Sequence, residues 1–433
     1  MEKCLLLGNG GREAVLAEFI SKGYELYTVC PYENPSIVEC VKNSNGKYIV
    51  DDPFNKEVVK NFIQDNKIDT CVISSDNLLQ DGLIDVAKEL GLKTFGPTSK
   101  GAKLEWSKTY ALDIVEKLAP EMIIKNYNIS DENELEKIIN TYESDNFVIK
   151  PEGLTGGKGV KVGGIHIKGK EEGLEYAKKC MQDSGNVIVQ DKIEGREFTV
   201  MALTDGKNIV VTPTTFDYPY RFDEDKGPGT GGMGCLSFEN GLLPFLEQSD
   251  IDECADLIRK TLEYVNKDSL EFNGVIYGGF FKTKDGIKFI EFNSRFGDPE
   301  ALNVLNSLET PFTEVMKHIF NKTLSKDNCK FKKTATFTLY IVTKEYAVES
   351  RKEPLVFTIN KEKIEEQGVK IYFANTKNIK ENTYTSVSNS RLFGLTTCAN
   401  TIEEAKEKVY NAIEGNLDKE LDYRKDIGNI YEH

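Results

Sequence analysis

The first hundred residues alternate short apolar strands with helical stretches, and this alternation limits the possible folds more than any other feature. The chain opens with an apolar strand, a glycine turn and a helix whose apolar residues share one side, EKCLLLGNGGREAVLAEFI. The alternation continues in ELYTVC (25–30), EVVKNFI (57–63), TCVISS (70–75), GLIDVAKEL (82–90) and LKTFGP (92–97). Because strands that alternate with helices form open α/β sheets, the pattern predicts a doubly wound α/β domain over residues 1–101.

Length and charge set the broad class of protein. A chain of 433 residues is too long for one hydrophobic core, and its length predicts two to four domains. The net charge of −15 disfavours nucleic acid and anionic membranes as partners. No apolar run could cross a bilayer, and the four-residue apolar run near the N-terminus is too short for a signal peptide. We therefore expect a cytoplasmic protein, a monomer or homodimer, that acts on small molecules.

Histidine and cysteine usage narrows the chemistry. The chain has three histidines, and its nine cysteines are odd in number, widely spaced and never arranged as CxxC. This disfavours a histidine-based triad, a zinc site and a disulfide framework. Carboxylates, lysines, arginines and backbone amides are left to do the chemistry, and the basic residues are expected to bind small anions.

The glycine turn GNGG (8–11) suggests a dinucleotide fingerprint, but the match is partial. Glu13 stands where G-x-G-x-x-G requires its third glycine, and the second strand ends in Cys30-Pro31 without the acid that would hold a ribose. A phosphate-sized anion at the helix N-terminus is the better prediction, with the backbone N–H groups of Asn9, Gly10 and Gly11 as donors.

A second glycine-rich loop follows a buried strand at KPEGLTGGKG (150–159). Lys150 closes the apolar strand FVIK, where an ammonium is costly unless an anion meets it. The glycines allow the backbone to fold over that anion. A Walker A loop is excluded because neither Ser nor Thr follows Gly157-Lys158. The alternative, taken for this loop alone, is a flexible hairpin with solvated lysines.

Two further segments favour a nucleotide site. In IKFIEFNSRFGDPE (287–300), strand periodicity places Glu291 and Asn293 on one face, where two oxygen ligands form half of a Mg²⁺ site that ATP oxygens and water complete. The segment DEDKGPGTGGMG (223–234), which we call the flap, is too rich in glycine for ordinary secondary structure and is predicted to close over a ligand. For each segment alone, an exposed strand face or a solvated turn is the alternative.

These motifs together resemble the phosphoribosylamine–glycine ligase family of the ATP-grasp superfamily. The resemblance rests on GNGGRE, FGPT with LEWSK, KPEGLTGGKGV, GPGTGGMG, IEFNSRFGDPE and YRKDIG, in that order along nearly the whole chain. It implies an N-terminal domain over 1–101, an ATP-grasp domain over 102–330 with a lid subdomain near 121–188, and an α+β C-terminal domain over 331–433. It also implies an ATP-dependent ligase of purine biosynthesis that joins glycine to phosphoribosylamine through a glycyl phosphate.

The resemblance carries over to individual residues. It implies an ATP site of Lys108, Lys150, Gly156, Gly157, Lys158, Gly159, Gln190, Asp191, Ile193 and Glu197, in which Gln190 to Ile193 line the adenine edge and Glu197 holds the ribose. It implies Mg²⁺, or Mn²⁺, on Glu291 and Asn293, and catalytic roles for Arg295, Lys150 and Asp298. The candidates for substrate binding are Asn9, Gly10, Gly11, Asp76, Asp217, Arg221, Gly231 and Gly232.

Three departures from the family pattern concern the acceptor side. Ala14-Val15 stands where relatives have His-Ala, SSDNLL (74–79) replaces Gly-Pro-Glu-Ala-Pro-Leu, and the run 217–220, Asp-Tyr-Pro-Tyr, replaces Asp-His-Lys-Arg. Three hypotheses therefore stay open: glycine joined to phosphoribosylamine, another carboxylate–amine pair, or a nucleotide-binding protein without ligase activity.

Overall fold

The computed structural model describes residues 1–156, 159–267 and 271–430, and it confirms a multidomain α/β and α+β fold. The N-terminal part is a parallel sheet in the doubly wound order β3-β2-β1-β4-β5. Its strands are β1 (Lys3–Leu7), β2 (Glu25–Cys30), β3 (Lys47–Val50), β4 (Thr70–Ile73) and β5 (Lys93–Phe95). Its helices are α1 (Gly11–Ile20), α2 (Pro35–Asn43), α3 (Lys56–Asn66), α4 (Asp76–Gln80) and α5 (Leu83–Glu89).

The sequence pattern missed α2 and β3, so the predicted third strand TCVI is the fourth. Helix α2 begins at a conventional N-cap, since the Asn34 side chain accepts hydrogen bonds from the backbone N–H groups of Ser36 and Ile37. Strand β3 lies at the sheet edge, and its first and last residues, Lys47 and Val50, are exposed. A short edge strand with little burial carries no clear alternation of apolar and polar residues, which is why the pattern did not reveal it.

The helix predicted at LEWSKTYALDIVEKL is two helices, α6 (Lys103–Trp106) and α7 (Lys108–Leu118). Ser107 separates them in an extended conformation and accepts a hydrogen bond from the Tyr110 N–H, which caps α7. The cap places Lys108 in the first turn of α7, beside the base of the glycine loop that follows Lys150.

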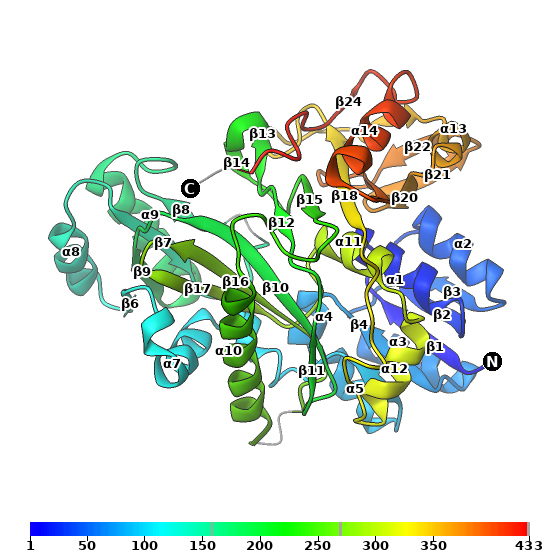
Figure 1. Cartoon of the computed structure of the whole chain (residues 1–433), viewed down its shortest axis with the longest axis horizontal. Helices are drawn as coiled ribbons and strands as arrows, with labels where there is room; N and C mark the ends of the chain where they lie inside the picture. The colour runs from blue at the N-terminus through cyan, green and yellow to red at the C-terminus, as the bar shows by residue number, and fades with distance from the viewer. Residues whose placement is uncertain (157–158, 268–270, 431–433) are drawn as a thin grey trace.

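Two antiparallel sheets form the centre of the chain (Figure 1). The first, in the order β6-β9-β7-β8, lies in the segment predicted as the lid; we call it the lid sheet, and it carries α8 and α9. The second sheet, in the order β11-β10-β16-β17, contacts α7, α10 and η1 (Pro120–Met122). The elements of the lid sheet and its helices are β6 (Asn126–Ile129), α8 (Glu132–Thr141), β7 (Phe147–Pro151), β8 (Lys161–Val162), α9 (Gly169–Ser184) and β9 (Val187–Asp191). The others are β10 (Arg196–Thr204), β11 (Ile209–Val211), α10 (Gln248–Lys267), β16 (Gly274–Thr283) and β17 (Gly286–Asn293).

The flap contains regular structure, which corrects the expectation that its glycines prevent it. Strand β14 (Lys226–Gly229) pairs with β13 (Tyr220–Phe222), and η2 (Asp223–Asp225) connects them. The hairpin stands between the lid and the C-terminal sheet in Figure 1. The flanking strands β12 (Phe216–Asp217) and β15 (Gly234–Ser237) extend the C-terminal sheet, so the flap is built into that sheet at both ends.

The C-terminal sheet has the order β12-β15-β18-β23-β20, and helices α11 and α14 pack on its strands β18 and β23. The remaining elements are α11 (Glu300–Ser307), α12 (Phe312–Phe320), β18 (Ala335–Thr343), β19 (Val356–Thr358), α13 (Lys361–Glu366), β20 (Lys370–Phe373), β21 (Thr376–Lys380), β22 (Thr383–Ser386), β23 (Phe393–Ala399), α14 (Ile402–Ile413) and β24 (Leu421–Asp422). Within the described ranges, no helix combines the length and apolar character needed to cross a membrane.

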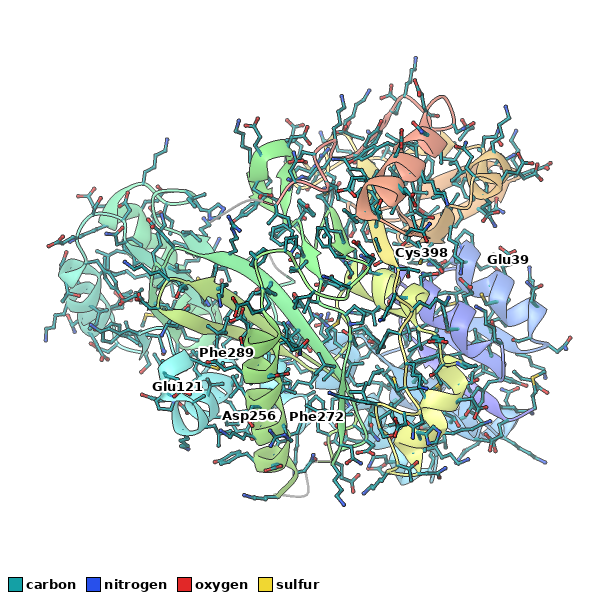
Figure 2. All side chains as sticks on the ribbon, in the orientation of Figure 1. Glu39, Glu121, Asp256, Phe272, Phe289 and Cys398 are labelled. Atoms are coloured by element: carbon teal, nitrogen blue, oxygen red, sulfur yellow. The ribbon has the colours of Figure 1, made fainter. Side chains whose placement is uncertain are left out.

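Contacts tie the C-terminal part to the N-terminal domain. Glu39 of α2, labelled in Figure 2, forms a 3.1 Å ion pair with Lys361 of α13. The buried Asn34 side chain donates to the carbonyl oxygens of Phe373, at 2.8 Å, and of Asn9 in the GNGG turn, at 3.1 Å. The GNGG turn therefore has a direct hydrogen-bonded connection to the C-terminal sheet through one side chain.

Candidate functional site

Lys150, the next-to-last residue of β7, is a buried cation, as its position near the end of an apolar strand predicted. Its side chain is only 8% exposed, and burial lowers the pKa of Lys150 to about 8. Attraction to Glu291 and Glu197 opposes this shift, and repulsion from Lys108 adds to it. A buried lysine binds an anion more strongly than a solvated lysine does. Little water screens the attraction, and the anion supplies the favourable interactions that the ammonium lost when it was buried.

Glu291 and Asn293 lie side by side on β17, as strand periodicity predicted. The side-chain nitrogen of Asn293, Nδ2, donates to Glu291 Oε1 at 3.3 Å, and its side-chain oxygen, Oδ1, accepts from Arg295 NH2 at 3.2 Å. Among the residues that the structure describes, no group of three or more His, Cys, Asp or Glu could hold a metal ion. The pair therefore fits a hard cation such as Mg²⁺ only if ligand phosphates and water supply the remaining oxygens.

The predicted adenine-binding segment runs along β9 and into β10. Gln190 is 2% exposed, and its amide nitrogen has no hydrogen-bond partner among the described residues. A buried donor without a partner is costly, so this nitrogen fits a purine acceptor. Asp191 differs: its carboxylate accepts from the Tyr142 hydroxyl at 2.9 Å, within the lid. Ile193 is half-buried in the β9–β10 connection.

Glu197, the predicted ribose ligand, is the second residue of β10 and lies opposite Phe281 of the neighbouring strand β16. Burial and the neighbouring carboxylate of Glu291 raise the pKa of Glu197 to about 7, against the attraction of Lys150. The structure thus brings Lys150, Glu197 and Glu291 together from three different strands.

The base of the glycine loop is anchored to α7. The Glu152 carboxylate accepts from the Ser107 hydroxyl at 2.7 Å and from the backbone N–H of Thr109 at 3.2 Å. Lys108 Nζ donates to the carbonyl oxygen of Gly153 at 2.6 Å. In this structure the ammonium predicted to bind phosphate is therefore hydrogen-bonded to the glycine loop.

The loop is less constrained further on. A side chain at Gly156 would meet no atom of the described residues within 4 Å, whereas the Gly159 carbonyl accepts from the Tyr176 hydroxyl at 2.7 Å. Gly157 and Lys158, which the sequence also assigned to ATP binding, lie outside the described residues.

Arg295 follows the predicted metal pair and is held by an acid that the sequence analysis missed. Its NH2 forms a 2.8 Å ion pair with Glu105 of α6. The Glu105 carboxylate also accepts from the Ser294 backbone N–H at 2.9 Å. Asp76 belongs to the same region: burial opposes the change, but Arg295 and Arg12 lower the pKa of Asp76. The SSDNLL segment therefore lies near the predicted catalytic arginine.

The GNGG turn differs from the predicted anion site. The backbone N–H of Gly10 donates to Glu13 Oε2 at 2.8 Å, and Glu13 Oε1 pairs with Arg12 at 2.8 Å. The N-terminus of α1 thus already carries a carboxylate, which leaves the Gly10 amide unavailable to a phosphate. The Asn9 side chain donates to the Tyr32 carbonyl at 3.1 Å, while its own oxygen is buried and has no hydrogen-bond partner within residues 1–156, 159–267 and 271–430.

Asp217 and Arg221, the two predicted substrate-binding residues beside the flap, lie in different environments. Burial, together with the carboxylates of Glu300 and Glu197, raises the pKa of Asp217 well above its usual range. Arg221 is 1% exposed; its Nε donates to the Tyr346 carbonyl at 3.1 Å and its NH2 pairs with Asp422 at 2.6 Å. Arg221 is thus a buried anchor between β13 and the C-terminal part, in place of the predicted substrate contact.

The remaining predicted residues, Asp298, Gly231 and Gly232, lie together beside Gly10 and Gly11. Two C-terminal residues, Tyr340 and Arg391, hold them in place. The sequence carried no local signal for either. The cavities of about 560 Å³ and 460 Å³ found elsewhere are lined by none of the predicted site residues.

We expect kcat/KM for ATP to fall as the pH rises above about 8, because Lys150 must be protonated to bind phosphate and burial lowers its pKa to about that value. A pH–rate profile checks this. Bound phosphate should favour the charged lysine, so the corresponding limb in kcat should lie at higher pH. A Lys150→Arg variant stays protonated and should lack the limb; its persistence there would assign the titration to another group.

Comparison with protein families matches three family models in succession. They are the N domain of phosphoribosylglycinamide synthetase at residues 2–105, its ATP-grasp (A) domain at 106–301 and its C domain at 336–430. The phosphoribosylamine–glycine ligase of Pyrococcus furiosus is 36% identical over 431 residues, which is 99% of this chain and 94% of the relative. That of Methanococcus vannielii is 35% identical over 439 residues, covering 98% and 96%.

Solved structures agree on the fold. The crystal structure of the Thermotoga maritima phosphoribosylamine–glycine ligase superposes with a TM-score of 0.77 at 23% identity, covering 98% of this chain and 99% of the other. The biotin carboxylase domain of the Hydrogenobacter thermophilus 2-oxoglutarate carboxylase, solved with MgADP, gives 0.70 at 15% identity, covering 98% and 92%. The chain has a buried lysine and an adjacent Glu-Asn pair, and the family models and phosphoribosylamine–glycine ligases match it over nearly its full length. The chain therefore belongs to the phosphoribosylamine–glycine ligase family of ATP-grasp enzymes.

Proposed function

We propose that the chain joins glycine to 5-phosphoribosylamine with hydrolysis of ATP to ADP and phosphate, in purine biosynthesis. The observation that carries the proposal is the match to phosphoribosylamine–glycine ligases over nearly the whole chain at 33–36% identity. The ATP-grasp family and the retained Glu291–Asn293 pair oppose a binding protein without ligase activity. We also propose that the protein is a cytoplasmic monomer or homodimer that binds neither nucleic acid nor membranes.

The proposed reaction needs no protein nucleophile. A carboxylate oxygen of glycine attacks the γ-phosphorus of ATP and ADP leaves, which gives glycyl phosphate. The amine of phosphoribosylamine then attacks the acyl carbon, loses a proton and expels phosphate to form the amide. Protein groups contribute by orienting the reactants and stabilising charge. Lys150 holds phosphate oxygens, Arg295 stabilises the transferring phosphoryl group, and Gln190 and Glu197 hold the adenosine.

Glu291 and Asn293 would hold Mg²⁺, which Mn²⁺ could replace, because carboxylate and amide oxygens suit both ions. Bound there, the ion would neutralise charge on the phosphates. Asn293 Oδ1 already accepts a hydrogen bond from Arg295 at 3.2 Å, so its second lone pair would serve the ion, and Arg295 is itself held by Glu105 at 2.8 Å. Lys108, which donates to Gly153 in this structure, is proposed to exchange that carbonyl for an ATP phosphate.

A second candidate is a ligase of the same family that acts on another carboxylate–amine pair. Two observations favour it, one beside and one within the 217–220 departure from the family pattern. The buried Arg221 side chain is held in an ion pair with the partly exposed Asp422. Tyr218 is fully buried and its hydroxyl donates to the Asn429 carbonyl at 2.8 Å, so the residue at the family's histidine position serves packing here.

Release of ADP with a panel of amino acids and amines distinguishes the two candidates. The proposed function predicts that turnover requires glycine and phosphoribosylamine together and that product is formed in proportion to ADP. Saturation by ATP without turnover on that pair, combined with turnover on another pair, would transfer the assignment to the second candidate. A site that hydrogen-bonds one substrate rejects analogues lacking the partner group by large factors, so the panel should give a clear answer.

We expect subtilisin to cut the glycine loop at residues 154–156 in the free protein, and ATP with Mg²⁺ to suppress that cut. This stretch lies beyond the anchors at Glu152 and Gly153, and a side chain placed at Gly156 would have no neighbour within 4 Å in the described part of the chain. Mass spectrometry of the fragments locates the cut. The flap, whose strands pair and whose last glycines are hydrogen-bonded by Arg391, serves as the internal control and should resist in both states. Equal cutting at 154–156 with and without nucleotide would contradict closure of this loop.

A further inference from the structure

Arg391 lies just before β23 in the C-terminal part and contacts two loops that carry predicted site residues. Its NH1 donates to the carbonyl oxygens of Gly231 at 2.6 Å, Gly232 at 3.0 Å and Asp298 at 2.7 Å. Its NH2 forms a 3.3 Å ion pair with Asp298 Oδ2, and both side chains are largely buried. A planar guanidinium fixes the direction of its donors, so the relative position of the two loops depends on this side chain.

Tyr340 of β18 completes the support of Asp298. Its hydroxyl donates to Asp298 Oδ1 at 2.5 Å, and its backbone N–H donates to the Met233 carbonyl at 2.8 Å. The Arg391 guanidinium lies 4.3 Å from the centre of the Tyr340 ring, a stacked arrangement that further restricts both side chains. Each oxygen of Asp298 therefore has one partner from the C-terminal part, and a carboxylate keeps additional lone pairs for a ligand.

The N-terminal turn docks on the same group. A Cβ at Gly11 would lie 2.0 Å from the Tyr340 hydroxyl, so only glycine allows this approach, and a Cβ at Gly10 would lie 3.6 Å from Asp298 Oδ2. Gly232 has φ +103°, a left-handed conformation, and packs against Pro299. Segments from all three parts of the chain thus meet around Arg391 and Tyr340.

We propose that Arg391, assisted by Tyr340, is a positioning residue for the amine-accepting half of the reaction. It acts through Asp298: with both carboxylate oxygens held, Asp298 accepts a hydrogen bond from the attacking amine and directs it at the acyl phosphate. The proposal rests on the proposed function. The hydrogen bonds and ion pairs described for Arg391 go to Gly231, Gly232 and Asp298, which lie outside the predicted ATP site, so we expect its loss to affect the amine and not ATP.

Steady-state kinetics of Arg391→Met and Arg391→Lys test the proposal. We expect kcat/KM for phosphoribosylamine to fall about 10²-fold in Arg391→Met, because misplacement by about 1 Å costs that much, while KM for ATP stays within twofold. Lysine cannot reproduce the planar set of donors, so Arg391→Lys should also be impaired. Tyr340→Phe removes a single hydrogen bond and should lower kcat/KM up to about tenfold; it also tests the proposal if Arg391→Met fails to fold.

A double-mutant cycle separates positioning from a general loss of structure. If Arg391 acts through Asp298, the double variant Arg391→Met, Asp298→Asn should be no slower than Asp298→Asn alone. Arg259→Met is the matched control: Arg259 lies on the exposed side of α10 and pairs with Asp256, labelled in Figure 2. It should keep wild-type kinetics.

The two proposals fail in different ways. If the wild type turns over glycine and phosphoribosylamine but Arg391→Met and Tyr340→Phe keep kcat/KM for the amine within twofold, the positioning role is overturned and the proposed function stands. Fully additive losses in the cycle, or a loss confined to KM for ATP, would overturn it as well. A wild type inert with that pair overturns the proposed function, and the same cycle is then measured with the amine that the panel identifies.

Discussion

Lys150→Met is expected to lower kcat about 10²–10³-fold, the usual cost of removing one preorganised charge from a reacting phosphate. The same change should leave thermal stability unchanged or increase it. Burial lowers the pKa of Lys150 to about 8, so below pH 8 the folded free protein carries a charge that its surroundings disfavour. Each unit of such a shift corresponds to about 1.4 kcal/mol, and methionine removes this cost while filling similar space.

Steady-state ADP release and calorimetric unfolding of the same preparation check both halves of this prediction. Lys178→Met is the matched control, because Lys178 is a partly exposed lysine of α9 that pairs with the exposed Glu132 at 3.4 Å. Glu291→Gln should lower kcat by a similar factor. A higher concentration of ATP should not restore the turnover of this variant. Turnover within threefold of the wild type in both Lys150→Met and Glu291→Gln would refute the placement of the phosphate and metal site.

The parts of the site that could be predicted from the sequence are those set by local rules. Lys150 stands out because an ammonium at the end of an apolar strand needs a compensating anion. Glu291 and Asn293 share a face because strand side chains alternate, and the structure places their side chains 3.3 Å apart. The Glu13 carboxylate on the Gly10 amide also follows a local rule, since a glutamate three residues after an N-cap bonds back to it. That rule, applied to GNGGRE, would have removed the Gly10 amide from the donors predicted for an anion there.

The parts that could not be predicted depend on contacts between distant segments. Arg391 and Gly231 are 160 residues apart, and neither the SRLFG segment nor its spacing indicates a contact with a glycine loop. Strand β3 was missed because an edge strand of four residues with exposed ends has too little burial to impose alternation. The flap was predicted as irregular from its glycines, but β15 and β12 fix both of its ends in the C-terminal sheet. Tertiary pairing there overrides local preference.

The YRKDIG segment supplies a second buried arginine, and we expect Arg424→Met to destabilise the protein by about 3–5 kcal/mol. Arg424 is fully buried: its NH1 pairs with Asp225 of the flap at 2.6 Å and its NH2 with Asp426 at 2.6 Å. NH1 also donates to the Tyr220 carbonyl at 3.0 Å. Removing the guanidinium takes the positive charge away from two largely buried carboxylates at the point where the β13–β14 hairpin joins the C-terminal part.

The physical cause of this destabilisation also predicts which substitutions should restore the stability lost in Arg424→Met. If the cost comes from buried carboxylates deprived of their arginine, neutralising them in the triple variant Arg424→Met, Asp225→Asn, Asp426→Asn should recover much of the stability. Thermal unfolding measured by calorimetry compares the single and triple variants with Arg259→Met, an exposed control that should change stability by less than about 0.5 kcal/mol. If Arg424→Met is as stable as that control, or if the triple variant is no more stable than the single one, the ion pairs do not hold the hairpin. The flap would then owe its position to β12 and β15 alone, and the protection from subtilisin expected for it should survive in Arg424→Met.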